Sequence, residues 1–175
     1  MKIAVQIEPV SGDAGASPNG SSVSVEYTWD ADTDILSAQL SPRATGQGMS
    51  GSVGLEGSDG SWLILDVAAG RINGVEIAVW PDVRKLSTLT PPATVEDARV
   101  VVPSRASQPS IASLEMDTRL VAETDGDRRT IHFRVGKPRG SRTIRLARDL
   151  LLDVDEKSQI SGLWLLNVPP GPAEL

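Results

Sequence analysis

The chain has 175 residues, of which 39% are hydrophobic, enough for the core of one compact domain or of two small ones. It contains no cysteine, which excludes a disulfide framework, a thiolate zinc site and a thiol nucleophile. A net charge of −6 disfavours non-specific binding to nucleic acid, because both partners would be negatively charged. With only 3% aromatic residues but sixteen glycines and twelve prolines, the chain needs an aliphatic core and many turns, which favours β-structure.

The amino-terminal segment and the apolar runs give the expected location. Glu8 and Pro9 interrupt the first apolar stretch before it reaches the length of a signal-peptide core. No apolar run approaches the ~20 residues that span a bilayer. We therefore expect a cytoplasmic protein that has no membrane partner.

Several segments alternate apolar and polar residues with a period of two, the pattern of half-buried strands. In chain order they cover residues 23–29, 36–40, 75–79 and 131–135. Residues 163–166 lack alternation, which predicts a strand covered on both faces. Residues 94–97 resemble a capping box and predict one short helical turn.

The chain contains an internal repeat. LILDVAAGRINGVEIAVWP at residues 63–81 matches LLLDVDEKSQISGLWLLNVP at residues 150–169, with one residue inserted in the polar turn. Residues 23–34 and 36–40 match residues 114–125 and 131–135, and the first strand near Ile3 has a counterpart near Ala98. The repeat also decides residues 142–155, whose spacing would allow a helix, because their glycine-rich counterpart would not. It predicts two strands joined by a turn.

These patterns predict an all-β fold with little helix, in which two similar antiparallel β-meander units pack with pseudo-twofold symmetry as a sandwich or barrel-like structure. The units cover residues 1–90 and 91–175, and they form either two units or one compact domain.

The repeat resembles a family of short bacterial proteins, domain of unknown function 2283. The first half of its pattern is present at residues 27–40, which include Asp30 and Asp32, and the second half at residues 65–77. In the second unit only the later half is legible, at residues 152–165. The resemblance implies a small β-meander in each unit and brings no activity with it.

Two carboxylates at equivalent repeat positions, Asp66 and Asp153, are candidate ligand-binding residues. Near a pseudo-twofold axis they could form an acid/base or metal pair. The simpler interpretation, which we favour, is that each accepts hydrogen bonds from backbone N–H groups of the turn that follows it. The acidic run Asp30 to Asp34 begins like a calcium loop, but it lacks the required glycine and glutamate and predicts a hairpin turn.

The second half carries a cluster of basic residues: Arg128, Arg129, Arg134, Lys137, Arg139, Arg142, Arg145 and Arg148. We expect Arg134 and Arg145 to project from adjacent strands on the outer face, beside His132, the single histidine. Such a patch could bind an anion or a protein partner. The favoured interpretation is a solvated face partly neutralised by the first unit. His132 itself should be exposed, without an identifiable acid beside it.

The tryptophans are divided between core and surface. Trp29 shares the parity of the core side chains of its strand, and Trp164 lies in a continuous apolar run, so both are expected in the core. Trp80 precedes Pro81 and is expected to cover a strand end or to form part of a partner surface.

The sequence leaves two functions open. The first is a non-catalytic binding or assembly module, with self-association or a protein partner. The second is an enzyme or small-ligand binder whose carboxylate-containing site lies at the junction of the units. The patterns indicate no cofactor, no metal and no catalytic residue, and they disfavour a nucleic-acid partner.

Overall fold

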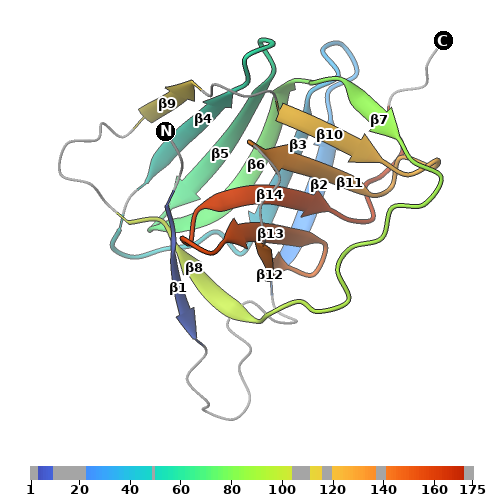
Figure 1. Ribbon diagram of the computed structural model, residues 1–175. Coiled ribbons are helices and arrows are strands. Elements are labelled where there is room, and N and C mark those ends of the chain that lie inside the picture. Colours follow the sequence, from blue (N-terminus) through green and yellow to red (C-terminus); the bar gives the residue numbers. More distant parts are fainter. Residues whose placement is uncertain are drawn as a thin grey trace.

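The computed structural model describes residues 4–9, 23–48, 50–103, 111–115, 120–136 and 141–171. These residues form strands, turns and extended connections and include no helix, so the predicted all-β fold is confirmed (Figure 1). Accordingly, no helix long and apolar enough to cross a membrane occurs in this part of the chain.

The first sheet has six strands. Its spatial order is β2 (Ser24–Trp29), β3 (Leu36–Ser41), β6 (Arg71–Val79), β5 (Trp62–Ala68), β4 (Gly51–Glu56) and β9 (Ile111–Glu115). All neighbours are antiparallel except β9, which runs parallel to β4. The last strand therefore comes from the half of the sequence that was assigned to the second unit.

The second sheet also has six strands. Its spatial order is β12 (Ser141–Ala147), β13 (Leu150–Asp155), β14 (Ile160–Leu165), β11 (Ile131–Val135), β10 (Leu120–Thr124) and β7 (Val83–Lys85). Here β7 is the parallel strand, and it comes from the first half of the sequence. Each half of the chain thus supplies one edge strand to the sheet of the other half.

The five antiparallel strands are connected in the same way in both sheets. The first sheet has the order β2-β3-β6-β5-β4, and the corresponding strands of the second sheet have the order β10-β11-β14-β13-β12. The pairing of β5 with β6 shifts register after Asp66, and that of β13 with β14 shifts after Asp153. A bulge therefore follows the aspartate of the repeated motif in both hairpins.

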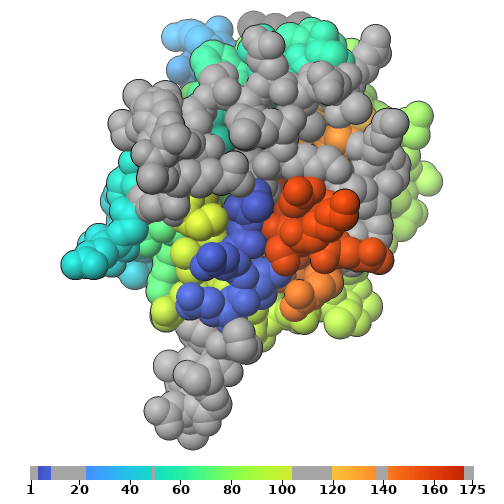
Figure 2. Space-filling model, turned by 60° about the vertical axis from the view of Figure 1, so that its left-hand side comes forward, coloured from blue at the N-terminus to red at the C-terminus, as the bar shows by residue number. Residues whose placement is uncertain are grey.

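A short two-stranded sheet joins the two halves at one side of the molecule. It pairs β1 (Gln6–Pro9) antiparallel with β8 (Ala98–Val101). Before β1, the Val5 N–H donates to the Ser158 carbonyl at 2.9 Å, and after β8 the Val102 N–H donates to the Gly70 carbonyl at 2.6 Å. In Figure 2, β1 lies between β8 and the turn that joins β13 to β14. The strand that opens each half thus contacts the hairpin turn of the other half.

The inner faces of the two sheets share one hydrophobic core. Alternation along β3 and β11 buries Leu36, Ala38 and Leu40 on one side and Ile131 and Phe133 on the other. Aliphatic side chains dominate, as the composition requires, and burial of each large one contributes about 1.5–3 kcal/mol. The strand predicted at residues 163–166 is buried on both faces, as expected.

Residues 142–155, whose spacing would also allow a helix, lie in the β12–β13 hairpin, so the prediction from the repeat is confirmed. The predicted helical turn at residues 94–97 is wrong. Glu96 is extended and lies parallel to β12: its N–H donates to the Thr143 carbonyl at 2.8 Å, and its carbonyl accepts from the Arg145 N–H at 2.9 Å. The open edge of β12 provides hydrogen bonds that a local helical turn would not make.

Candidate functional site

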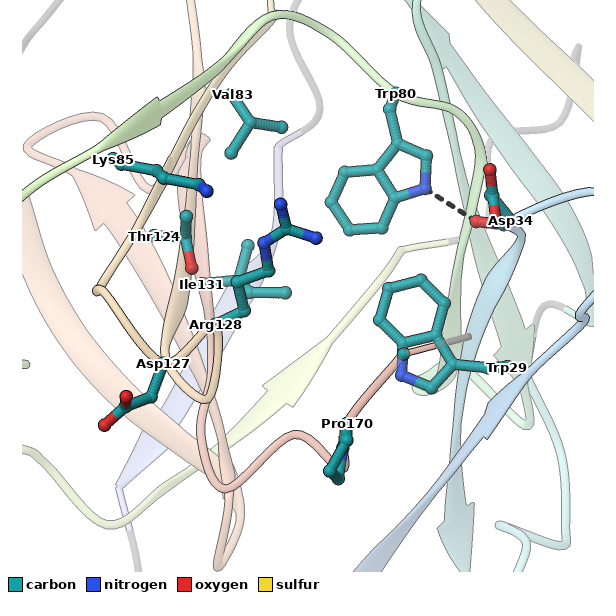
Figure 3. A pocket seen from close by; sticks show the side chains of 11 residues that line it. Trp29, Asp34, Trp80, Val83, Lys85, Thr124, Asp127, Arg128, Ile131 and Pro170 are labelled. Carbon is teal, nitrogen blue, oxygen red and sulfur yellow. Dashed lines mark hydrogen bonds between the residues drawn. The ribbon is translucent and has the colours of Figure 1, made fainter. Parts of the chain in front are cut away.

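A cavity of about 560 Å³ opens between the two sheets at one end of the molecule (Figure 3). Because sheet strands begin or end there, the lining comes from strand termini and turns of both sheets. We call this cavity the tryptophan pocket; its lining residues are Trp29, Asp34, Trp80, Val83, Lys85, Thr124, Asp127, Arg128, Ile131, Pro170 and Gly171.

One wall of the tryptophan pocket is aromatic. The rings of Trp29 and Trp80 stack with centroids 5.7 Å apart and an interplanar angle of 13°. Trp80 also packs on Phe133 of the facing sheet, at a centroid distance of 5.7 Å. The Trp29 Nε1–H donates to the Pro169 carbonyl at 3.0 Å, and the Trp80 Nε1–H donates to the Asp34 carbonyl at 2.7 Å. Because both indole N–H groups bind backbone, the rings are held in place before any ligand arrives.

The opposite wall is cationic. In Figure 3 the side chains of Lys85 and Arg128 extend toward the cavity. The Asp127 carboxylate points away from it, and Asp34 lies beyond Trp80 as seen from Arg128. Lys85 takes part in none of the ion pairs formed among the described residues. The interior of the pocket is therefore apolar on one side and positively charged on the other.

The β10–β11 turn positions Arg128. The Asp125 carboxylate accepts the Arg129 N–H at 2.9 Å and the Thr130 N–H at 3.3 Å, and the Asp125 carbonyl accepts the Arg128 N–H at 3.2 Å. Arg128 has a φ of 56°, a left-handed conformation that this hydrogen-bonded turn maintains. The turn thus sets the direction in which the Arg128 side chain leaves the backbone.

The candidate residues His132 and Asp153 meet on the outer face of the second sheet. The buried Asp153 carboxylate accepts three hydrogen bonds: from Thr143 Oγ1 at 2.7 Å, His132 Nε2 at 2.9 Å and Trp164 Nε1 at 3.2 Å. The His132 and Trp164 rings also stack, with centroids 3.9 Å apart. These contacts hold four side chains from four strands in one rigid arrangement.

A glycine makes this arrangement possible. His132 and Asp153 belong to β11 and β13, and Gly162 of β14 lies between them. A Cβ at Gly162 would be 2.8 Å from Asp153 Oδ2 and 3.2 Å from His132 Nε2. Since neither distance leaves room for a methyl group, only glycine allows the two side chains to meet across β14.

The expectation for His132 was wrong in two respects. Its side chain is only 13% exposed, and it has an acid at hydrogen-bond distance, Asp153, with Glu123 Oε1 at 3.8 Å from Nδ1. The sequence placed His132 on the correct face of β11 but could not show that β13 brings a carboxylate across β14. Neither residue lines the tryptophan pocket, so we assign the group a structural role.

The two repeat-equivalent carboxylates do not share a site. Asp66 Oδ2 accepts from Arg43 Nη1 at 2.9 Å, in a pair whose side chains are 30% and 58% exposed. The favoured expectation that both carboxylates accept turn N–H groups is also wrong. In the second hairpin that acceptor is Asp155, whose Oδ1 accepts the N–H groups of Lys157 and Gln159, each at 2.9 Å.

Arg134 and Arg145, the two basic residues expected to form a patch, lie apart on the second sheet. Arg134 and Arg145 are not on adjacent strands, because β14 and β13 separate β11 from β12. Arg134 Nε lies 3.3 Å from Glu123 Oε1, and Arg145 Nε lies 3.6 Å from Asp97 Oδ1. The neutralising carboxylates come from the second half of the sequence, whereas the first unit was expected to supply them. Lys137 and Arg139 lie outside the described residues.

The acidic run behaves as predicted. Asp30 Oδ1 accepts the Asp32 N–H at 2.9 Å and the Thr33 N–H at 3.3 Å, and the Asp34 N–H donates to the Asp30 carbonyl at 2.9 Å. These bonds close the β2–β3 hairpin. The run is a turn, and its last residue contributes to the wall of the tryptophan pocket.

The residues of the tryptophan pocket were not identified as a site from the sequence. Trp29 was expected in the core, yet it is only partly buried and lines the cavity, while Trp80 at a strand end agrees with the expected cover. The available signal was the position of both tryptophans at strand termini. No protein-family model matches the chain, and a comparison with curated proteins finds no match. The resemblance to domain of unknown function 2283 therefore stays a prediction.

Proposed function

We propose that this chain is a non-catalytic binding module whose tryptophan pocket takes a compact, apolar or aromatic molecule that carries an anionic group. The observation that carries this proposal is the pairing of a preformed tryptophan wall with cationic side chains across one cavity (Figure 3). We also place the protein in the cytoplasm, on the sequence evidence.

The size and composition of the pocket support a small ligand. A volume of about 560 Å³ lies within the ~300–1,000 Å³ of typical ligand sites, which combine apolar walls with a few polar groups. The Trp29 and Trp80 rings are already fixed by hydrogen bonds and stacking, so binding loses little side-chain entropy. A planar apolar group is the natural partner of such a wall.

The charges support an anionic group on that ligand. Lys85 extends toward the cavity and has no ion-pair partner in the described part of the chain, and the Arg128 guanidinium extends to the same side. An anion there would form charge-assisted hydrogen bonds in partly dehydrated surroundings. The described lining includes no histidine or cysteine, Asp127 points away, and Asp34 lies on the far side of Trp80 from Arg128. We therefore infer that the pocket offers binding groups without a general base beside its cations.

We further propose that the fold arose by duplication of one antiparallel β unit of five strands. The unit is not the simple meander that the sequence predicted, because β3 lies beside β6 and not beside β4. The common strand order of the two sheets and the bulge after both Asp66 and Asp153 support this history. The two copies have since diverged at this aspartate. Asp153 is buried in a hydrogen-bonded group, whereas Asp66 forms an exposed ion pair.

Two fluorescent probes with similar rings test the proposed ligand class. 8-Anilinonaphthalene-1-sulfonate carries an anionic group, and N-phenyl-1-naphthylamine does not. Trp80→Ala should weaken binding of both probes about tenfold or more, a loss of ~1.4 kcal/mol. Lys85→Gln should weaken binding of the sulfonate alone, because it removes charge and keeps the apolar wall.

Matched controls are a tryptophan and a cation that do not line the pocket. Trp62→Ala removes a tryptophan that is 41% exposed and outside the pocket, and Arg84→Gln removes the cation next to Lys85 in the chain. Both controls should bind the probes as the unmodified protein does. Far-UV circular dichroism verifies that each variant is folded. Equal affinity of all variants for both probes would contradict the proposal.

A further inference from the structure

A second cavity, of about 320 Å³, lies at the opposite ends of strands that reach the tryptophan pocket. Val23, which precedes β2, lines this cavity, and Trp29 at the end of β2 lines the tryptophan pocket. Likewise, β6 runs from Arg71 in this cavity to the residue before Trp80. We call it the arginine pocket; its described lining residues are Val23, Leu40, Pro42, Arg43, Ala44, Thr45, Arg71, Ile72, Asn73, Val100 and Leu146. The lining contains two arginines and no carboxylate.

Within the described part of the chain, the Arg71 side chain has no direct partner for its positive charge. Its guanidinium forms no hydrogen bond or ion pair among these residues, although nearby Arg99 has Glu8 Oε2 at 4.0 Å. Burial, and then the charge of Arg99, lower the pKa of Arg71 from its ordinary value, while Glu8 acts in the opposite direction. A partly dehydrated guanidinium beside another cation is costly unless an anion accompanies it.

Two further residues with donor side chains line the same cavity. The Asn73 side chain is buried, and its Oδ1 accepts the Ala44 N–H at 3.0 Å, which fixes the amide plane. The Asn73 amide nitrogen forms no hydrogen bond among the described residues. Arg43 also lines the cavity, and its Nη1 donates to Asp66 Oδ2 at 2.9 Å.

We propose that the arginine pocket binds a small oxyanion, either a phosphate or the carboxylate of a small molecule, through the Arg71 guanidinium, with Asn73 and Arg43 as additional donors. The planar guanidinium donates two parallel hydrogen bonds to either kind of oxyanion. Apolar residues such as Leu40, Val100 and Leu146 line the remaining wall and exclude water, which strengthens the charged contact. The site is separate from the tryptophan pocket and does not depend on its function.

The test is calorimetric titration of the full chain with inorganic phosphate and, separately, with acetate, at an ionic strength held constant with sodium chloride. Binding of one or both anions is expected, and the stronger one identifies the kind of oxyanion. Arg71→Gln should weaken it at least tenfold. Arg71→Lys keeps the charge but loses the paired donors, so it should show an intermediate loss. Arg84→Gln, at the far end of the molecule, should have no effect.

The same variants separate this proposal from the proposed function. Arg71→Gln should leave binding of 8-anilinonaphthalene-1-sulfonate at the tryptophan pocket unchanged, and Lys85→Gln should leave phosphate binding unchanged. Absence of phosphate and acetate binding above the chloride control would overturn the anion site, as would binding that Arg71→Gln does not weaken. Loss of probe binding in Lys85→Gln alone would leave the anion site standing.

Discussion

Replacing Asp153 with alanine should destabilise the protein far more than the same replacement of Asp66, although the two occupy equivalent positions in the repeat. Asp153 is 5% exposed and accepts hydrogen bonds from three side chains of the second sheet. Among the described residues, the Asp66 carboxylate has one partner, Arg43, and both side chains of that pair are substantially exposed to solvent. The pair of substitutions therefore compares one chemical change in two environments.

The structure sets the size of the difference. A hydrogen bond to a charged group contributes about 1.5–3 kcal/mol, and a buried donor that loses its acceptor adds a desolvation cost. Thr143, His132 and Trp164 share one carboxylate, so their contributions do not add in full. We expect Asp153→Ala to lower the free energy of unfolding by about 3–5 kcal/mol, the usual cost of removing one partner from a buried charged group. An exposed pair contributes about 0–1 kcal/mol, which is the expected loss for Asp66→Ala.

Urea denaturation followed by far-UV circular dichroism measures both losses without relying on Trp164, which contacts the altered site. The midpoint should move strongly for Asp153→Ala and little for Asp66→Ala, with a common slope. Thr143→Val, which removes one donor of the three, should fall between them. Two outcomes would refute the idea that the Asp153 carboxylate holds Thr143, His132 and Trp164 together. One is an equal loss of unfolding free energy in the two aspartate variants, and the other is a loss below about 1 kcal/mol for Asp153→Ala.

Three other predictions use single substitutions. Gly162→Ala should cost about 1–3 kcal/mol by overpacking, whereas Gly126→Ala, whose added Cβ meets no atom within 4 Å, should change the unfolding midpoint little in the same urea assay. Arg142 donates to Glu96 and holds the pKa of that carboxyl below its ordinary value. The exposed pair stabilises the fold by about 0.5 kcal/mol near pH 7, and this stabilisation is lost as pH falls through the lowered pKa. Glu96→Gln should therefore be less stable than the unmodified protein at pH 7 and equally stable at pH 2, and a difference that persists at pH 2 would contradict this. Burial, and then the Asp149 carboxylate, raise the pKa of Tyr27. As pH rises above about 10, the Tyr27 hydroxyl therefore ionises in the unfolded chain before it does in the folded protein, and the free energy of unfolding should fall. Tyr27→Phe removes the hydrogen bond to the Asp149 carbonyl, so in thermal denaturation it should be about 1 kcal/mol less stable at pH 7 and lose less stability at alkaline pH.

Local patterns were sufficient to predict most strands. The period-two alternation at residues 36–40 and 131–135 corresponds to β3 and β11, and the repeat decided correctly that residues 142–155 form a hairpin. Such patterns are reliable because each strand has one face in the core, which the sequence records directly. The predicted helical turn at residues 94–97 failed because a capping motif is a local signal, and an open strand edge elsewhere in the chain competed for the same backbone groups.

The sites could not be predicted in the same way. His132 and Asp153 are two strands apart in the sheet, and nothing in either local pattern shows that a glycine between them lets the side chains meet. The placement of Arg134 and Arg145 on adjacent strands failed for the same reason, since consecutive strands along the chain are not neighbours when the connection skips two positions.

From the sequence one can predict the all-β class and, for most strands, which side chains face the core. Both depend on which residues tolerate burial and turns, and that is a local property of the sequence. Tertiary structure alone decided which strand ends meet. It brought Trp29, Trp80 and Lys85 to one end of the molecule and Arg71 and Asn73 to the other. The physical reason is that each cavity is lined by strand ends and turns far apart in the chain. Which of these meet depends on strand order, twist and the exchange of edge strands between the halves, and local sequence does not encode it.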